Sequence, residues 1–197
     1  MKFVLASNSP RRHQLLTQFD LDLMIASHTF DESSVRKNQD PEEYCRLISR
    51  GKAESLYDNY PNYSVLSADT IVVIDDVILE KPIDRDDAIR MLNLLSAREH
   101  KVITAVSLLC KNKSTSFSFI EKTLVTFNPL SKEEISYYID KYKPYDKSGA
   151  YGIQDFSSIF VKSINGCYFN VMGLPLSTLF QYLKKFDLVQ IPFNTGS

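Results

Sequence analysis

Two arginines, Arg11 and Arg12, directly follow a helix-start signal, where a helix does not favour positive charge. Ser9 is a good N-cap residue, Pro10 suits the first helical position, and apolar residues at helical spacing follow. The N-terminal end of a helix carries partial positive charge and prefers acidic side chains. Two guanidinium groups fit there if they and the backbone N–H groups bind an anion such as phosphate. The alternative is that both side chains extend into solvent, since arginine is tolerated in helices.

A second polar feature interrupts the apolar, β-branched run VLSADTIVVI at Asp69 and Thr70. Aspartate is depleted in strands and is costly when it is buried alone. Either the strand breaks there, or the carboxylate and the hydroxyl face a ligand at the rim of a site. Glu80 and Lys81 follow on the return arm of a predicted hairpin, so one short turn brings two carboxylates and a lysine to one region.

Two further stretches carry polar groups that could reach the same ligand. Lys52 lies on the apolar face of a predicted helix, where it needs a partner or a ligand unless its ammonium group reaches solvent at the edge of that face. The stretch DKSGAYGIQ, residues 146–154, combines flexible glycines with the polar Lys147 and Gln154. It could bind a ligand through backbone amides, or it could be an ordinary tight loop.

Together these residues favour one class of chemistry. The candidate cations are Arg11, Arg12, Lys52, Lys81 and Lys147, and the candidate carboxylates are Glu32, Asp69 and Glu80. Cations that bind phosphates, with carboxylates that hold a divalent metal and a water, are typical of phosphoanhydride hydrolysis. The sequence has no Walker A, GxGxxG or GxSxG motif, and its three histidines are in no triad-like context, so we expect only structural roles for them.

The elements that must position these residues alternate between strand and helix. The patterns predict strands at 2–6, 64–74, 77–79, 100–110 and 116–127, a second apolar run at 21–26, and a hairpin that pairs 159–164 with 167–172 through Asn165-Gly166. They predict helices that start at Pro10, that span 41–57, that follow Asp84 and the capping box at Ser131, and that span 175–186. This mixture predicts an α/β or α+β fold with a mixed sheet, and not a regular doubly wound one.

Composition limits the partners of the protein. The 197 residues carry a net charge of -1, so a general electrostatic attraction to nucleic acid or to an acidic membrane is not expected. The three cysteines are widely spaced without a CxxC pair, which favours reduced thiols over disulfides or a zinc site. The N-terminal apolar run is too short for a signal peptide, and no run has the length of a membrane span, so we expect a cytoplasmic protein.

Four stretches in register carry a family resemblance. SNSPRRHQLL, SADTIVV, EKP and DKSGAYGIQ through NVMGLPL resemble the Maf family of nucleoside triphosphate pyrophosphatases, over about residues 3–185. The resemblance implies an α/β fold similar to the inosine triphosphate pyrophosphatase group, with two lobes around an extended mixed β-sheet and a central cleft. It implies one Maf-like domain over residues 1–188, and we expect a flexible tail over 189–197. It also implies cleavage of a nucleoside triphosphate to the monophosphate and pyrophosphate with Mg²⁺ or Mn²⁺, and a homodimer.

The resemblance also implies roles for individual residues. Asp69 matches the proton acceptor, and Glu32 matches an acidic partner of the metal or the water, so these two carboxylates are the implied metal ligands. The phosphate-binding positions are matched by Ser9, Arg11, Arg12, Lys52 and Lys81, with Lys81 also implied in catalysis. Positions linked to base preference are matched by Arg11, Thr70 and Gln154, and we expect Lys147 to bind substrate beside them. The EKP and GAYGIQ forms resemble the branch that prefers dTTP and UTP. Departures from the family pattern are Ser67, Ala97, Cys167 and Asp155, the last of which adds charge beside Gln154.

These residues favour attack of an activated water on the α-phosphorus, with pyrophosphate as the leaving group and Asp69 as the base. Attack at the γ-phosphorus, which would release inorganic phosphate, is the alternative chemistry. A non-catalytic nucleotide-binding regulator of cell division and septum formation is the alternative function. Such a regulator needs phosphate-binding groups but no water-activating carboxylate, so Asp69 favours the enzyme.

Overall fold

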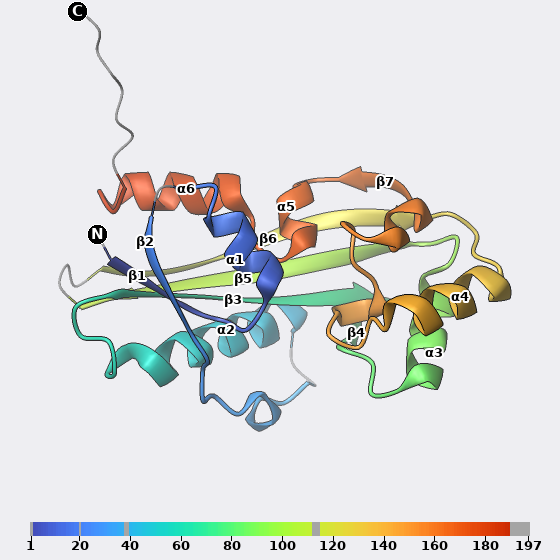
Figure 1. The fold of residues 1–197 in the computed structure, drawn as a ribbon, viewed down its shortest axis with the longest axis horizontal. Coiled ribbons are helices and arrows are strands. Elements are labelled where there is room, and N and C mark those ends of the chain that lie inside the picture. The colour runs from blue at the N-terminus through green and yellow to red at the C-terminus, as the bar shows by residue number, and fades with distance from the viewer. Residues whose placement is uncertain (1, 20, 38–39, 112–114, 190–197) are drawn as a thin grey trace, which may run out of the picture.

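A seven-stranded mixed sheet runs the length of the molecule in this computed structural model, which describes residues 2–19, 21–37, 40–111 and 115–189 (Figure 1). The strands are β1 (Lys2–Ala6), β2 (Asp22–Ala26), β3 (Ser64–Ile74), β4 (Val77–Leu79), β5 (Glu99–Cys110), β6 (Thr115–Phe127) and β7 (Val161–Asn165). Their order is β2-β1-β3-β5-β6-β7, and β4 pairs with β3. Strand β1 is parallel to β2 and β3, and the other pairs are antiparallel. The predicted mixed sheet is therefore confirmed.

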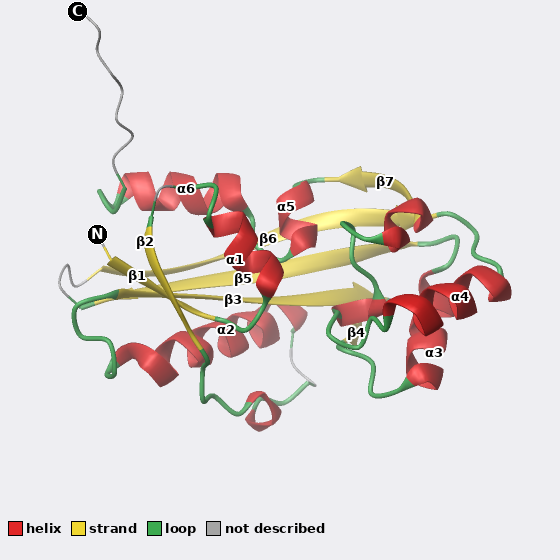
Figure 2. Ribbon diagram, viewed as in Figure 1, coloured by secondary structure: helices red, strands yellow, loops and turns green. Residues whose placement is uncertain are grey.

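Helices cover both faces of this sheet (Figure 2). They are α1 (Pro10–Leu16), α2 (Pro41–Tyr57), α3 (Arg85–Leu95), α4 (Lys132–Tyr142), α5 (Tyr168–Met172) and α6 (Leu176–Lys185), with 3-10 turns η1 (Glu32–Ser34), η2 (Ser148–Ala150) and η3 (Phe156–Phe160). Helix α2 packs on one face, through cores that it shares with β1, β3 and β5. On the other face, α1 and α6 cover one end, and α3 and α4 cover the other. The hydrophobic core is thus divided between the two ends of one continuous sheet.

The predicted helices form where their end signals place them. Asp40 accepts hydrogen bonds from two backbone N–H groups at the start of α2, and Asp84 accepts one at the start of α3. At the start of α4, Ser131 and Glu134 form the predicted capping box, with nitrogen-to-oxygen distances of 2.7 and 3.1 Å. Charged and hydroxyl side chains close in sequence therefore mark these boundaries.

Strand β3 positions the site because its outer edge is only partly paired. Strand β1 pairs with its first residues, up to Leu66, and β4 pairs with its last, from Val72. Between them, residues 67–71 have no strand partner on that edge among the described residues. The strand continues through Asp69 and Thr70 without a break, because β5 pairs with it along its other edge. Since side chains alternate along a strand, Asp69 faces α2 and Thr70 faces the opposite side.

The predicted second hairpin is wrong. Strand β7 ends at Asn165, and the residues after Gly166 form helix α5 in place of a returning strand. The Thr123 hydroxyl of β6 binds both the N–H and the carbonyl of Cys167, at 3.0 and 3.2 Å, and so fixes the chain there. Asn170 is then fully buried and donates to the carbonyl of Val102 at 3.1 Å. These tertiary contacts override the local Asn-Gly turn signal.

Three other expectations concern the whole chain. The three cysteines are unpaired, which agrees with the expectation of reduced thiols. Within the described ranges, none of the helices has the length and apolar character that a membrane crossing requires. The expected flexible tail falls on residues 189–197, of which 190–197 lie outside the described residues.

Candidate functional site

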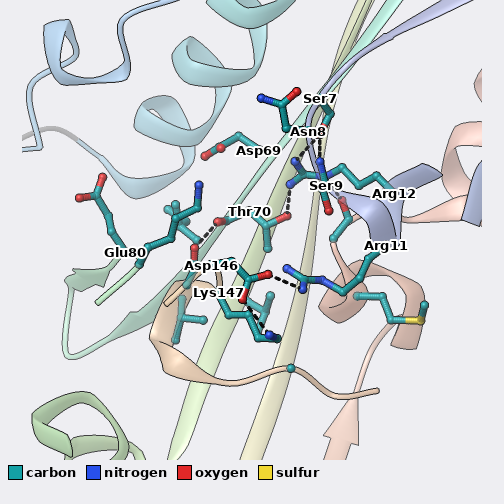
Figure 3. A pocket seen from close by; sticks show the side chains of 18 of the residues that line it. Ser7, Asn8, Ser9, Arg11, Arg12, Asp69, Thr70, Glu80, Asp146 and Lys147 are labelled. Atoms are coloured by element: carbon teal, nitrogen blue, oxygen red, sulfur yellow. Dashed lines mark hydrogen bonds and ion pairs between the residues drawn. The ribbon is translucent and has the colours of Figure 1, made fainter. Parts of the chain in front are cut away.

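A cavity of about 540 Å³ opens at the unpaired edge of β3. It is lined from both faces of the sheet, because the edge exposes Asp69 on one side and Thr70 on the other. The cavity brings together every residue that the sequence predicts for the site, namely Ser9, Arg11, Arg12, Glu32, Lys52, Asp69, Thr70, Lys81, Lys147 and Gln154. Figure 3 shows several of these side chains converging from β3, from α1 and from the loop that carries Lys147.

Lys52 joins the two predicted catalytic carboxylates. Its side chain reaches from α2 into the cavity, and its Nζ lies 2.7 Å from Asp69 Oδ1 and 3.1 Å from Glu32 Oε1. Lys52 is only 5% exposed, so its ammonium group does not reach solvent at the edge of the helix. A buried lysine needs a charged partner, and the two carboxylates supply it.

Asp69 is held on several sides. Its Oδ1 accepts from Lys52, and the Cys45 thiol lies 3.3 Å from its carbonyl oxygen and 3.8 Å from Oδ2. Burial, with the charge of Asp69, raises the pKa of the Cys45 thiol well above its usual range. Cys45 therefore stays protonated, so it can donate a weak hydrogen bond but is no nucleophile.

Arg12 turns into the cavity and links its walls. Its guanidinium donates to the carbonyl of Gly173 at 2.7 Å, to Thr70 Oγ1 at 2.9 Å and to Ser7 Oγ at 3.3 Å. Burial lowers the pKa of Arg12 and the nearby Asp69 carboxylate opposes that shift, and the group stays charged at neutral pH. The alternative that Arg12 extends into solvent is therefore wrong.

Arg11 contacts the loop that carries Asp146 and Lys147. Its Nη1 lies 2.9 Å from Asp146 Oδ2, and Lys147 Nζ lies 2.8 Å from the other oxygen of the same carboxylate (Figure 3). Burial alone would raise the pKa of Asp146, but the hydrogen bonds from Lys147 and Arg11 outweigh it and lower the pKa. Asp146 is thus an ionised anchor for two cations.

Ser9 departs from its predicted local role. It occupies the N-cap position of α1, but its side chain makes no capping hydrogen bond, and its backbone N–H donates to Ser7 Oγ at 3.2 Å. The prediction of a hydroxyl cap is therefore wrong, although Ser9 does line the cavity.

Lys81 and Gln154 line the cavity with exposed side chains. Neither makes a hydrogen bond or an ion pair to another residue in the part of the chain that the structure describes. Both side chains are therefore available to a ligand.

Several cavity residues escape sequence reasoning. His28 Nε2 lies 3.6 Å from Glu32 Oε1, and burial, with the charge of Lys52, lowers the pKa of this histidine. Tyr44 donates to Glu80 from α2, and Lys37 forms an ion pair with the same carboxylate. No local spacing signals these positions, because His28 lies in a loop and Tyr44 fits the apolar face of α2. His100 is a core residue, as expected, with Nε2 2.8 Å from Tyr151 Oη and a pKa that burial lowers to about 4.

The family model described as Maf-like protein matches residues 2–186 of this chain. The chain belongs to that family. Among its relatives, the dTTP/UTP pyrophosphatase of Geobacillus sp. (strain WCH70) is 44% identical over 184 residues, which cover 93% of this chain and 97% of that protein. The dTTP/UTP pyrophosphatase of Parabacteroides distasonis is also 44% identical, over 187 residues that cover 94% and 96%. The Ham1 protein of Staphylococcus aureus shares the fold, with a TM-score of 0.50, 16% identity and coverage of 94% and 99%.

The carboxylates of this Maf-like chain fit one kind of metal site. No group of three or more His, Cys, Asp or Glu side chains among the described residues could hold a metal ion. Magnesium usually binds through one or two carboxylates plus the phosphates of a substrate, and not in a cage made of protein alone. Glu32 and Asp69 are two such carboxylates, brought together by Lys52 at the wall of the cavity. Their oxygens fit an ion that is completed by a triphosphate.

Proposed function

We propose that this protein is a nucleoside triphosphate pyrophosphatase that hydrolyses dTTP and UTP to the monophosphate and pyrophosphate. The observation that carries the proposal is the buried Asp69 carboxylate, which Lys52 holds. The same cavity contains Arg11 and Arg12 of α1 and Lys81, which follows β4. Relatives that align with nearly the whole chain are named dTTP/UTP pyrophosphatases. The same comparisons do not favour a non-catalytic regulator.

In the proposed reaction, phosphate oxygens are bound by the side chains of Arg11, Arg12 and Lys81. Ser9, which lines the same cavity, also binds a phosphate oxygen. Lys52 holds Asp69 through Oδ1, which leaves Oδ2 as the oxygen that accepts a proton from the attacking water. That water attacks the α-phosphorus, the bond to the bridging oxygen breaks, and pyrophosphate leaves. The cations stabilise the negative charge that develops on the phosphate oxygens. Lys147, Thr70 and Gln154 would contact the nucleoside part of the substrate.

A divalent ion, Mg²⁺ or Mn²⁺, would be held by Glu32 and Asp69 together with the triphosphate. When bound, it would neutralise negative charge on the phosphates and so make the phosphorus easier to attack. We also propose that the protein works in the cytoplasm as a homodimer, with residues 1–188 as a single domain of two lobes. Sedimentation of the purified chain would test the dimer.

Pyrophosphate release from dTTP, UTP, CTP, ATP and GTP, with Mg²⁺ or Mn²⁺, tests the function directly. Asp69→Asn is the matched variant, because it keeps the size of the side chain and removes the base. We expect release from dTTP and UTP that falls at least about 100-fold in the variant. Release of inorganic phosphate would indicate γ-attack. Tight dTTP binding without turnover in folded protein would refute the enzyme and support the regulator.

A further inference from the structure

Alternating charges link α1 to the turn that carries Gln154. Arg11 binds one oxygen of Asp146, and Lys147 Nζ lies 2.8 Å from the other oxygen (Figure 3). The same Nζ lies 3.7 Å from Asp155 Oδ2. Two carboxylates, those of Asp146 and Asp155, therefore share Lys147. The Lys147 side chain is only 14% exposed, so solvent screens these contacts less than it screens surface pairs.

Asp155 also fixes the backbone of the turn. Its Oδ1 accepts from the N–H of Ser157 at 3.0 Å, lies 2.6 Å from the Ser157 hydroxyl, and accepts from the Tyr138 hydroxyl at 3.4 Å. The fully buried Ser157 hydroxyl in turn accepts from the N–H of Gly152 at 3.0 Å. One carboxylate thus organises both ends of the 152–157 turn, which presents Gln154 to the cavity.

Gly152 brings Lys147 to this carboxylate. A Cβ atom at Gly152 would lie 2.8 Å from Lys147 Cε and 3.0 Å from Asp155 Oδ2. The lysine side chain therefore crosses directly over the backbone of the turn. Asp155 is not among the residues that line the cavity, whereas Gly152, Ile153 and Gln154 are. Any effect of Asp155 on a ligand must therefore pass through the turn and through Lys147.

We infer that Asp155 is a positioning residue for nucleoside binding in this chain. It holds the Gln154 turn and Lys147 in place before substrate arrives, so the nucleoside part of a pyrimidine triphosphate meets a preformed wall. The inference rests on the proposed function, because it assigns a role in binding the same substrate. Asp155 does not line the cavity, and it acts on the site through Lys147 and the Ser157 turn, so its effect belongs to KM and to the choice of base, and not to kcat.

Three variants test the inference. Asp155→Asn keeps an acceptor for Ser157 but removes the charge that faces Lys147, and Asp155→Ala removes both. Asp84→Asn is the control, because Asp84 also accepts from a backbone N–H at a helix start but does not line the cavity. The measurements are kcat and KM for dTTP and CTP, with thermal unfolding of each protein.

We expect KM for dTTP to rise about threefold in Asp155→Asn, which loses only the charge that faces Lys147, and about tenfold in Asp155→Ala, which also frees the turn. The kcat should stay within about twofold, and the preference for dTTP over CTP should fall. A merely structural role would lower the unfolding temperature and leave the preference unchanged, as we expect for Asp84→Asn. Unchanged KM and preference in both Asp155 variants would overturn the inference.

Failure of the proposed function can be separated from failure of the inference. If the wild-type protein releases no pyrophosphate from any nucleotide, the proposed function fails. Calorimetric titration with dTTP and CTP then replaces kinetics. Weaker dTTP binding and reduced discrimination in Asp155→Ala would still support the positioning role. Equal affinities in the wild type and in the variant would overturn it.

Discussion

Replacing Lys52 with methionine tests how the catalytic carboxylate is held. Methionine has a similar length, so it fills the space of the lysine stem without its charge. Lys52 is 5% exposed and Asp69 is 9% exposed, so the substitution leaves a carboxylate buried without its main partner. Breaking a buried pair from one side costs about 3–5 kcal/mol. Because Asp69 opens onto a cavity and keeps the Cys45 contact, we expect the lower end, about 3 kcal/mol of unfolding free energy.

A double-mutant cycle isolates the interaction. Asp69→Asn removes the charge that Lys52→Met leaves behind, so the double variant should be less destabilised than the sum of the two single variants. We expect a coupling free energy of at least about 1 kcal/mol from urea unfolding at neutral pH. The matched control is Arg98→Met with Asp75→Asn, a pair at 2.6 Å that is largely exposed. Such surface pairs contribute little, so the control should show no resolvable coupling. Additive effects at Lys52 and Asp69 would refute the view that the lysine holds the base.

Three further predictions concern other parts of the molecule. Arg11→Ala should raise KM for dTTP about tenfold or more with little change in unfolding free energy, because its pair with Asp146 is partly exposed; steady-state kinetics and urea unfolding would check this. Gly51→Ala should lower stability by about 1–3 kcal/mol, since the new Cβ would lie 2.4 Å from the Phe30 ring, and thermal unfolding would show it. The His100 pKa is lowered to about 4, so the unfolded chain binds a proton that the folded chain does not, and unfolding free energy should fall as pH falls from about 6.5 to 4. His100→Gln should flatten that slope in urea unfolding across this range.

Local sequence signals account for most of the architecture. Capping residues such as Asp40 and Ser131 satisfy backbone N–H groups within their own segment, so they fix helix starts without help from the rest of the chain. The long strands were predictable because β-branched runs alternate between two buried faces. The prediction of a second hairpin was wrong because the contacts of Thr123 and Asn170 outweigh the turn preference of Asn165-Gly166. These contacts join segments more than 40 residues apart, so no local pattern reveals them.

Site residues were predictable from the sequence where the residue type conflicts with the apolar pattern of its own helix or strand. Lys52 on an apolar helix face and Asp69 within an apolar strand both conflict with local pattern, and the structure resolves both conflicts with one ion pair. His28, Tyr44 and Asp146 create no such conflict, because Tyr44 fits the apolar face of α2, and His28 and Asp146 are ordinary polar residues of loops and turns. Their place at the cavity follows from contacts between distant segments, such as the pair between Arg11 and Asp146, and no local pattern records these contacts.

The two arginines at the start of α1 are tolerated before any phosphate binds. Each guanidinium already has acceptors from other elements, the Gly173 carbonyl for Arg12 and the Asp146 carboxylate for Arg11. The two sets of contacts differ in strength. Arg12 is anchored at three points, whereas the Arg11 pair is 28% and 57% exposed and is weakened by solvent. A triphosphate carries more negative charge than one carboxylate, so it can take Arg11 from Asp146, while Arg12 keeps the walls of the cavity together.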